Sequence, residues 1–249
     1  MTYSIAFAGK GGTGKTTMAG LLVKYLVDTG RTPVLAVDAD SNSNLNEVLG
    51  LEVEGTLGDA REEMKKGGIP GMTKDIFMEM KIQGAVVETT GFDLVVMGRP
   101  EGAGCYCAAN TLLTDCLDRL IKNYANVVID NEAGMEHISR LTTNNIDVLL
   151  AVSDPTRRGI QAAARIIELS KALGLRIGRH LLMVNRAKEG QAEAIEKAVS
   201  DFDLELLGSV PEDPLVQEFD LNGKPTFELG KDSVALRAAY EIFEKIVQT

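Results

Sequence analysis

The sequence predicts a single-domain α/β fold, in which a mostly parallel sheet is covered by helices on both faces. Three observations predict it. Short apolar runs alternate with helical patterns, a glycine-rich loop joins the first strand to the first helix, and no Pro/Gly/Ser-rich linker divides the 249 residues. Strands that alternate with helices are joined by right-handed crossovers, which place helices over both faces. We therefore expect one domain over residues 1–249.

The expected strands are short runs rich in β-branched and apolar residues. They cover residues 4–8, 33–37, 94–97, 127–129, 148–152, 181–184 and 206–210. Apolar residues at helical spacing predict helices over 16–27, 111–121, 160–173 and 234–247. Residues 52–90 are the least regular stretch and are interpreted as an insertion; they hold Met64, Met72, Met78 and Met80. These methionines either fill an uneven core or form an adaptable docking surface for a protein client.

The composition excludes several classes of function. The 26 basic and 36 acidic residues give a net charge of −10, which disfavours nucleic acid and anionic lipid as partners. No apolar run approaches the roughly 18 residues of a membrane-spanning helix, and the chain enters its first strand without a signal peptide. The three cysteines form no disulfide framework. We therefore expect a reduced, cytoplasmic compartment and no membrane partner.

Residues 9–17, Gly-Lys-Gly-Gly-Thr-Gly-Lys-Thr-Thr, match the phosphate-binding pattern G-x-x-x-x-G-K-[ST] between a strand and a helix. The backbone N–H groups of such a loop turn toward phosphate oxygens, and the helix N-terminus adds its positive end. Lys15 is expected to reach the β- and γ-phosphates, and the Thr16 hydroxyl to bind Mg²⁺. The predicted nucleotide-binding residues of the loop are Gly11, Gly12, Thr13, Gly14, Lys15, Thr16 and Thr17.

The second lysine of the loop, Lys10, adds a resemblance to a family. Residues 9–17 resemble the deviant Walker A motif of the group of dimeric ATPases that comprises MinD, ParA and the nitrogenase Fe protein. The resemblance implies a homodimer in which Lys10 crosses the interface and touches the phosphates of the opposite subunit. Such a lysine places positive charge where the transition state is negative.

Carboxylates follow two of the expected strands, since residues 33–37 lead into Asp38 and Asp40 and residues 127–129 lead into Asp130. The carboxyl ends of parallel strands face the ligand crevice. The resemblance implies that Asp40 orients the attacking water and that Asp38 lies near Mg²⁺ and its waters. It also implies that Asp130 holds Mg²⁺ through a water, and that Gly134 in the second switch senses the γ-phosphate.

The residues after strand 181–184 bear on the nucleotide base. Guanine-specific relatives carry Asn-Lys-x-Asp here, whereas this chain has Lys188 in place of the aspartate. Lysine has no acceptor for the guanine N–H groups, so we expect ATP rather than GTP. Asn185 can still pair with the purine. Three further residues resemble the loop that passes adenine in these ATPases, namely Pro211, Glu212 and Asp213.

Cys105-Tyr106-Cys107 follows strand 94–97 within a glycine-rich segment. Residues two apart in an extended stretch point to one face, so Cys105 and Cys107 suggest half of a soft-metal site. Two copies across a dimer axis would supply four sulfurs to Zn²⁺ or Ni²⁺. Cys116 lies on an apolar helical stripe and is expected in the core.

A narrower resemblance joins these motifs. The phosphate loop, the Cys-x-Cys pair and residues 133–137 together resemble the CooC/AcsF type of nickel-insertion ATPase, which matures carbon monoxide dehydrogenase or acetyl-CoA synthase. The resemblance implies ATP hydrolysis coupled to nickel insertion into a client enzyme. Two alternatives stay open. One is a MinD/ParA-like positioning ATPase, which gives no reason for the cysteines, and the other is an Fe-protein-like reductase, in which His137 would replace a cluster cysteine.

Overall fold

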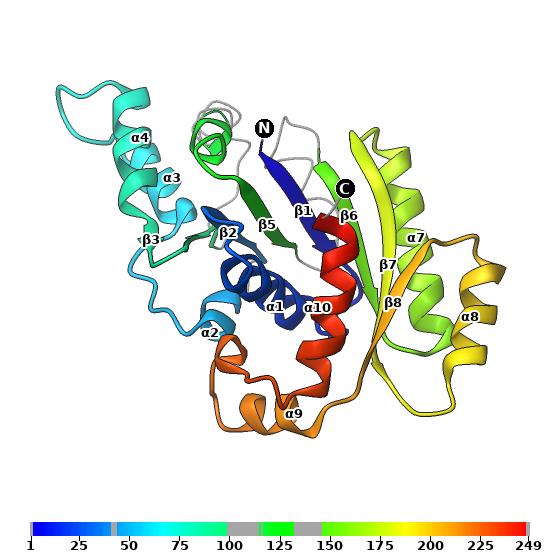
Figure 1. Ribbon diagram of the computed structural model, residues 1–249. Helices are drawn as coiled ribbons and strands as arrows, with labels where there is room; N and C mark the ends of the chain where they lie inside the picture. The colour runs from blue at the N-terminus through cyan, green and yellow to red at the C-terminus, as the bar shows by residue number, and fades with distance from the viewer. Residues whose placement is uncertain (1, 41–43, 99–114, 116, 132–145, 248–249) are drawn as a thin grey trace.

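An eight-stranded sheet forms the centre of the computed structural model, which describes residues 2–40, 44–98, 115, 117–131 and 146–247 (Figure 1). Its strand order is β3-β4-β2-β5-β1-β6-β7-β8. Among the described strands only β3, at one edge, runs antiparallel to its neighbour. The strands are β1 (Tyr3–Ala8), β2 (Val34–Ala39), β3 (Val86–Glu88), β4 (Phe92–Val96), β5 (Asn126–Asn131), β6 (Ile146–Ser153), β7 (Ile177–Ala187) and β8 (Leu206–Pro211).

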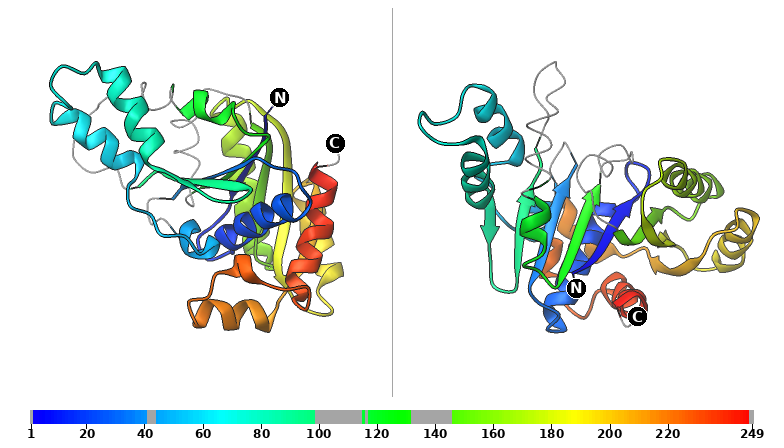
Figure 2. Two further views of the ribbon diagram at one scale, coloured as in Figure 1. Left: turned by 60° about the vertical axis from the view of Figure 1, so that its left-hand side comes forward. Right: turned by 90° about the horizontal axis from the view of Figure 1, so that it is seen from above.

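Helices cover both faces of this sheet, as Figures 1 and 2 show. One face packs against α1 (Lys15–Asp28) and α10 (Val234–Val247). The other packs against α3 (Leu57–Lys65) and α4 (Lys74–Gly84) at the β4 end, and against α7 (Arg157–Ala172) and α8 (Ala192–Asp201) at the β7 end. The shorter helices α2 (Leu45–Leu49) and η1 (Thr226–Glu228) pack against α1, and α9 (Pro214–Leu221) packs against η1.

The two-residue period of the strands explains how one sheet supports two layers. In β1, Ile5 and Phe7 join the core under α1 and α10, whereas Ala6 and Ala8 face the opposite layer. All six residues of β2 and of β5 are buried. Central strands that are covered on both faces are therefore buried along their whole length rather than at alternate residues. The predicted single-domain, mostly parallel α/β fold is confirmed.

The predicted strands and helices are found close to their expected bounds, and α10 begins and ends at the expected residues. The helix expected over 111–121 falls partly on residues outside the described ranges, Cys116 among them. The sequence analysis missed β3, α2, α8 and α9. The elements β3, α2 and α9 span only three, five and eight residues, so their apolar periodicity is hard to see. Helix α8 does bury Ile195, Ala198 and Val199 on one face, a helical pattern that the sequence analysis overlooked.

The stretch 52–90 is more regular than expected, because it forms α3, α4 and β3. A capping box starts α3: the Thr56 hydroxyl accepts from the backbone N–H of Asp59, whose carboxylate accepts from the backbone of Thr56. Met64 and Met78 are buried in the core beneath this hairpin, as the core-filling interpretation predicts. Exposed apolar side chains remain at Ile69, Ile76 and Met80.

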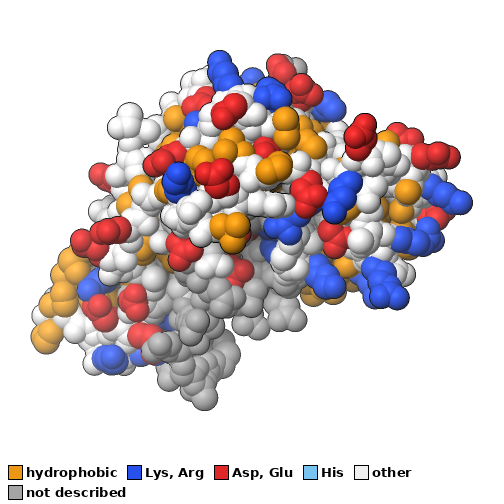
Figure 3. Space-filling model, turned by 90° about the horizontal axis from the view of Figure 1, so that it is seen from below, with side chains coloured by type: hydrophobic (Ala, Val, Ile, Leu, Met, Phe, Trp, Pro, Cys, Tyr) orange, Lys and Arg blue, Asp and Glu red, His pale blue; other side chains and the backbone are white. Residues whose placement is uncertain are grey.

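The surface is mixed in charge despite the net charge of −10. On the face that Figure 3 shows, acidic and basic side chains are interspersed. Within the described residues, no helix combines the length and the apolar character needed to cross a membrane.

The close contact between α1 and α2 depends on the absence of a side chain at Gly20. A Cβ at Gly20 would lie 2.2 Å from Cγ1 of Val48, whose branched side chain is stiff. We expect Gly20→Ala to lower the free energy of unfolding by about 1–3 kcal/mol, even though alanine favours a helix by roughly 0.5–1 kcal/mol. Denaturant titration measures this loss, and Gly20→Ala combined with Val48→Ala should recover most of it relative to Val48→Ala alone. A Gly20→Ala protein more stable than wild type would contradict the packing account.

Candidate nucleotide-binding site

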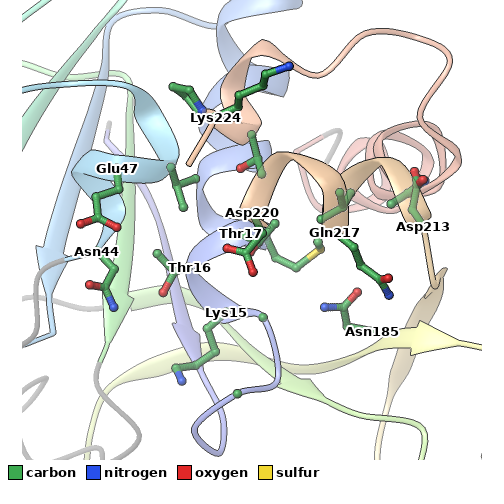
Figure 4. Close-up of a pocket in the computed structure, with 18 of the residues that line it drawn as sticks. Lys15, Thr16, Thr17, Asn44, Glu47, Asn185, Asp213, Gln217, Asp220 and Lys224 are labelled. Atoms are coloured by element: carbon green, nitrogen blue, oxygen red, sulfur yellow. The ribbon is translucent and has the colours of Figure 1, made fainter. Parts of the chain in front are cut away.

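A cavity of about 880 Å³ opens where the carboxyl ends of the strands meet the start of α1 (Figure 4). A pocket of this size accepts a nucleotide. Most of the predicted nucleotide-site residues line it: Gly11, Gly12, Gly14, Lys15, Thr16, Thr17, Asp40, Asn185, Pro211, Glu212 and Asp213.

The phosphate loop is closed by its own hydrogen bonds. The Lys10 carbonyl accepts from the Thr13 hydroxyl at 2.9 Å and from Nζ of Lys15 at 3.4 Å. Gly14 ends the loop in the left-handed region, at φ 89°, and a Cβ there would lie 2.4 Å from Nδ2 of Asn185. Glycine is therefore required both for the turn and for the close approach. Lys15 can exchange its carbonyl partner for phosphate oxygens without rebuilding the loop.

Lys10 and Thr13, unlike Lys15 and Thr16, do not line the cavity. Thr13 is buried, and its carbonyl accepts from Nδ2 of Asn185 at 2.9 Å, so it holds the loop in place. Lys10 is exposed. Its predicted action on the phosphates of a second subunit stays a prediction.

Asp38 and Asp130 end neighbouring strands and lie directly opposite each other in the β2–β5 register. Both are buried, with exposures of 0% and 1%. The carboxylate of Asp38 accepts from the backbone N–H of Leu45 at 3.0 Å and of Asp40 at 3.1 Å. It therefore fixes the start of α2 and the position of Asp40, as well as contributing negative charge.

The pKa values of both carboxyls are raised, and burial is the main cause. Burial raises the pKa of Asp38 to about 6, against the opposing backbone hydrogen bonds of Leu45 and Asp40. Burial raises the pKa of Asp130 to about 7; the Thr16 hydroxyl and Lys15 lower it, while the charge of Asp38 raises it further. Two buried acids side by side favour a bound cation.

The residues present fit Mg²⁺. Oδ1 of Asp130 is buried and has no hydrogen-bond partner among the residues that the structure describes. Mg²⁺ prefers oxygen ligands, keeps several of its waters and is held by one or two carboxylates together with substrate phosphates. Thr16, Asp38 and Asp130 supply such oxygens beside the phosphate loop. These three residues therefore have the oxygen ligands that the predicted Mg²⁺ site requires.

Asn185 joins the base end of the cavity to the phosphate loop. Besides its bond to the Thr13 carbonyl, its Oδ1 accepts from the backbone N–H of Arg186 at 2.9 Å. The side chain is 5% exposed and lines the cavity. Asn185 thus braces the loop from β7, and its pairing with the purine stays a prediction.

Asp213 holds the loop after β8 in place. Its Oδ1 accepts from the backbone N–H of Leu215 at 2.9 Å, and its Oδ2 accepts from the Ser233 hydroxyl at 2.6 Å and the backbone N–H of Ala235 at 3.0 Å. Burial pushes the pKa of Asp213 upward, but the Ser233 and backbone hydrogen bonds outweigh it and the pKa is lowered. This carboxylate therefore anchors the starts of α9 and α10 beside the cavity.

Several lining residues were missed by the sequence analysis. They are Asn44, Glu47, Arg186, Val216, Gln217, Asp220 and Lys224. Figure 4 shows Asn44 and Glu47 at α2, Gln217 and Asp220 on α9, and Lys224 on the segment after α9, whereas Arg186 belongs to β7. In the sequence, these residues are marked only by their closeness to Asp40, Asn185 or Asp213. Most of them reach the cavity through the packing of the short helices α2 and α9, which the sequence does not show.

Other predicted residues lie outside the described ranges: Cys105, Cys107, Gly134 and His137. Within the described ranges, no group of three or more His, Cys, Asp or Glu side chains could hold a metal ion by itself. The Cys-x-Cys metal site is therefore untested by this structure.

The closed phosphate loop at a helix N-terminus, the lysine within it and the paired carboxylates define a P-loop nucleoside triphosphatase. Residues 5–227 match the family described as the CobQ/CobB/MinD/ParA nucleotide binding domain. The chain belongs to this family of ATP-binding ATPases.

Relatives and a solved structure extend the comparison. The chain is 44% identical over 248 residues to the uncharacterized ATP-binding protein MJ0685 of Methanocaldococcus jannaschii, with 98% of each chain covered. It is 32% identical over 241 residues to the carbon monoxide dehydrogenase accessory protein CooC of Rhodospirillum rubrum, covering 90% of this chain and 89% of CooC. Pyrococcus horikoshii MinD, solved with Mg-ADP, superposes with a TM-score of 0.72 at 25% identity, covering 100% of this chain and 97% of MinD.

The raised pKa of Asp130 predicts how stability depends on pH. A carboxyl with pKa 3.8 when unfolded and about 7 when folded destabilises the nucleotide-free protein progressively as pH rises from about 4 to about 7. Asp130→Asn removes this penalty, so we expect it to unfold at higher denaturant than wild type at pH 8. The advantage should shrink toward pH 5, by about 1.4 kcal/mol for each pH unit below the folded pKa.

The control is Asp203→Asn, an exposed substitution in the turn after α8, where asparagine also accepts the positive φ of 51°. Its difference from wild type should not change between pH 5 and pH 8. An Asp130→Asn advantage that is the same at both pH values would contradict the assigned burial penalty.

Proposed function

We propose that this ATPase is a metallochaperone, in which nucleotide-driven dimerisation and ATP hydrolysis are coupled to nickel insertion into a carbon monoxide dehydrogenase or acetyl-CoA synthase. The observation that carries the proposal is the 32% identity to CooC, a carbon monoxide dehydrogenase accessory protein, over nine-tenths of the chain. The Cys105-Tyr106-Cys107 motif supports it, since two nearby thiols suit a soft metal as cargo. Such a role belongs in the cytoplasm, with the client enzyme as partner.

ATP binds with its phosphates in the loop of residues 11–17. Lys15 and the loop N–H groups bind the β- and γ-phosphates, and Asp40 orients the attacking water. Thr16 and, through waters, Asp38 and Asp130 would hold Mg²⁺, which would supply positive charge against the phosphates. The partner's Lys10 in the homodimer adds the positive charge that the open side of the loop lacks.

The cargo site needs two subunits. Each chain offers two thiolates, Cys105 and Cys107, and a tetrahedral Ni²⁺ or Zn²⁺ takes four ligands. Metal binding and dimerisation are therefore linked, and linkage is reciprocal. If ATP closes the dimer, ATP changes the affinity for metal by the same factor by which metal changes the affinity for ATP. Opening after hydrolysis then hands the ion to the client.

A positioning ATPase of the MinD kind is the second candidate, favoured by the superposition with Pyrococcus horikoshii MinD. A membrane-binding member would use an amphipathic helix with a free apolar face and a basic polar face. The apolar face of α10 is already buried, at Leu236, Ala239, Ile242, Phe243 and Ile246. Residues 231–249 carry as many acidic as basic residues. Both observations support the metallochaperone over the membrane-bound alternative.

The role of Lys10 across the dimer predicts complementation between two inactive proteins. Lys10→Ala and Asp40→Asn should each have low ATPase activity. In a mixed dimer, the Lys10→Ala subunit keeps its own Asp40 and receives Lys10 from its partner, so one of two sites works. Random mixing of a symmetric dimer should restore roughly a quarter of wild-type activity.

The matched control mixes Lys10→Ala with a protein that carries both Lys10→Ala and Asp40→Asn. No Lys10 is present in that mixture, so activity should stay low. The absence of rescue in the first mixture, with dimers present, would show that Lys10 does not act across the interface.

The cargo site predicts about one Ni²⁺ or Zn²⁺ per dimer, as four thiolates per ion require. Replacing Cys105 and Cys107 by serine should abolish metal binding and weaken dimerisation while leaving ATP binding nearly intact. Cys116→Ser is the control and should keep the metal. Metal analysis of anaerobically purified protein, with the oligomeric state measured on the same sample, tests this. Tight stoichiometric metal on a monomer, or unchanged binding in the double variant, would reject the site and favour the positioning candidate.

A further inference from the structure

A groove of about 530 Å³ runs between α3 and α4, the two helices of the hairpin beside the β3 edge of the sheet (Figures 1 and 2). Its α4 wall is apolar, because Ile76, Met80 and Gly84 recur every four residues and so share one face of the helix. Met80 and Gly84 line the groove, and Ile76 continues the same row. The side chains of Ile76 and Met80 are 56% and 41% exposed. The hairpin therefore presents a row of apolar surface to solvent.

The opposite wall, formed by α3 and the residues before it, is acidic. Carboxylates outnumber lysines four to two among the charged lining residues, which are Glu54, Asp59, Glu62, Glu63, Lys66 and Lys81. Lys81 on α4 pairs with Glu63 on α3, and both side chains are partly exposed. Such a pair contributes little stability, so a cation of a partner can compete for Glu63. An apolar wall opposite an acidic wall fits an amphipathic helix with apolar side chains along α4 and Lys or Arg side chains along α3.

The charge of the groove favours a different protein over a second copy of this chain. A twofold contact pairs a surface patch with itself, so two acidic walls would face each other across such an interface. Like charges in that position are unfavourable. The net charge of −10 adds to the repulsion between copies and steers basic partners toward the chain.

The hairpin is anchored to the strand that leads to the proposed cargo motif. The backbone N–H of Gly58 donates to the Met97 carbonyl at 2.8 Å, and a Cβ at Gly98 would lie 2.4 Å from Oγ1 of Thr56. Cys105 follows Gly98 by seven residues in the sequence, and seven residues reach at most about 25 Å. A protein bound in the groove is therefore held near the start of the segment that carries the two thiols.

We propose that the groove between α3 and α4 is the docking site for a basic amphipathic helix of the client enzyme. Ile76 and Met80 bind the apolar side of that helix, and the acidic side chains of α3 bind its Lys and Arg side chains. Docking holds the client beside the segment from which the ion is transferred. The identity of the partner rests on the proposed function, whereas the chemistry of the bound helix follows from the groove.

The test uses two fluorescent 18-residue helical peptides that share one leucine face and carry either lysine or glutamate on the other. Fluorescence anisotropy measures their binding to the full chain. Wild type should bind the lysine peptide about tenfold or more tightly than the glutamate peptide, and added salt should reduce this preference. Ile76→Ser/Met80→Ser should weaken binding of the lysine peptide about tenfold, through the loss of apolar contact. Glu54→Gln/Glu63→Gln should remove most of the preference for lysine.

Leu169→Ser/Leu173→Ser is the matched control, because it replaces two exposed apolar side chains at the same spacing near the end of α7. It should bind the lysine peptide as wild type does. Equal binding of the two peptides to wild type, or equal weakening by both serine pairs, would overturn the inference. Self-association of wild type that Ile76→Ser/Met80→Ser abolishes would assign the groove to a second copy and also overturn it.

The identity of the partner is tested with the apo form of carbon monoxide dehydrogenase, ATP and Ni²⁺. Activation by wild type should fall several-fold with Ile76→Ser/Met80→Ser, while the ATPase activity measured without the client stays unchanged. Undiminished activation by this variant would overturn the docking inference. Failure of wild type to activate the client, with the peptide preference intact, would instead overturn the proposed function.

Discussion

The buried carboxylates Asp38 and Asp130 impose the constraint on which the rest of the site depends. They end adjacent strands, at exposures of 0% and 1%, with Lys15 and Thr16 as the opposing charge and donor. Burying two acids side by side is unfavourable unless a cation is nearby. The fold keeps this arrangement because β2 and β5 are central strands with fixed register. A divalent cation with phosphate ligands would relieve the repulsion, so its binding is expected to stabilise the protein.

Hydrogen bonds between distant segments connect this centre to the base end. Asn185 on β7 bonds the carbonyl of Thr13, 172 residues earlier. The Asp213 carboxylate accepts hydrogen bonds from Ser233 and Ala235, so it joins the loop after β8 to the start of α10. The apolar face of α10 then packs on α1, whose first turn carries Lys15 and Thr16. These hydrogen bonds thus tie the base end of the cavity both to the phosphate loop and to α10.

The sequence predicts the central part of this site well and its margins poorly, for physical reasons. The phosphate loop is a local motif, and Asp38 and Asp130 follow runs whose burial shows in their composition. Gln217 and Glu47 reach the cavity only through the packing of α9 and α2, which depends on contacts across the whole chain. The segment 52–90 was expected to be irregular because its helices are short, although the Thr56–Asp59 capping box marks one start. The Cys105 and Cys107 motif lies outside the described residues, so the cargo site depends on the sequence and on the similarity to CooC.

The central claim is that Asp38 and Asp130 form a preformed cation site that governs nucleotide binding. Calorimetric titration of ATP with and without Mg²⁺, on wild type and on the Asp38→Asn/Asp130→Asn protein, tests it most directly. The account predicts that Mg²⁺ strengthens ATP binding to wild type. In the double variant this effect should largely disappear, and binding of Mg²⁺-free ATP should become tighter, because two negative charges no longer repel the phosphates. An undiminished effect of Mg²⁺ in the double variant would contradict the account.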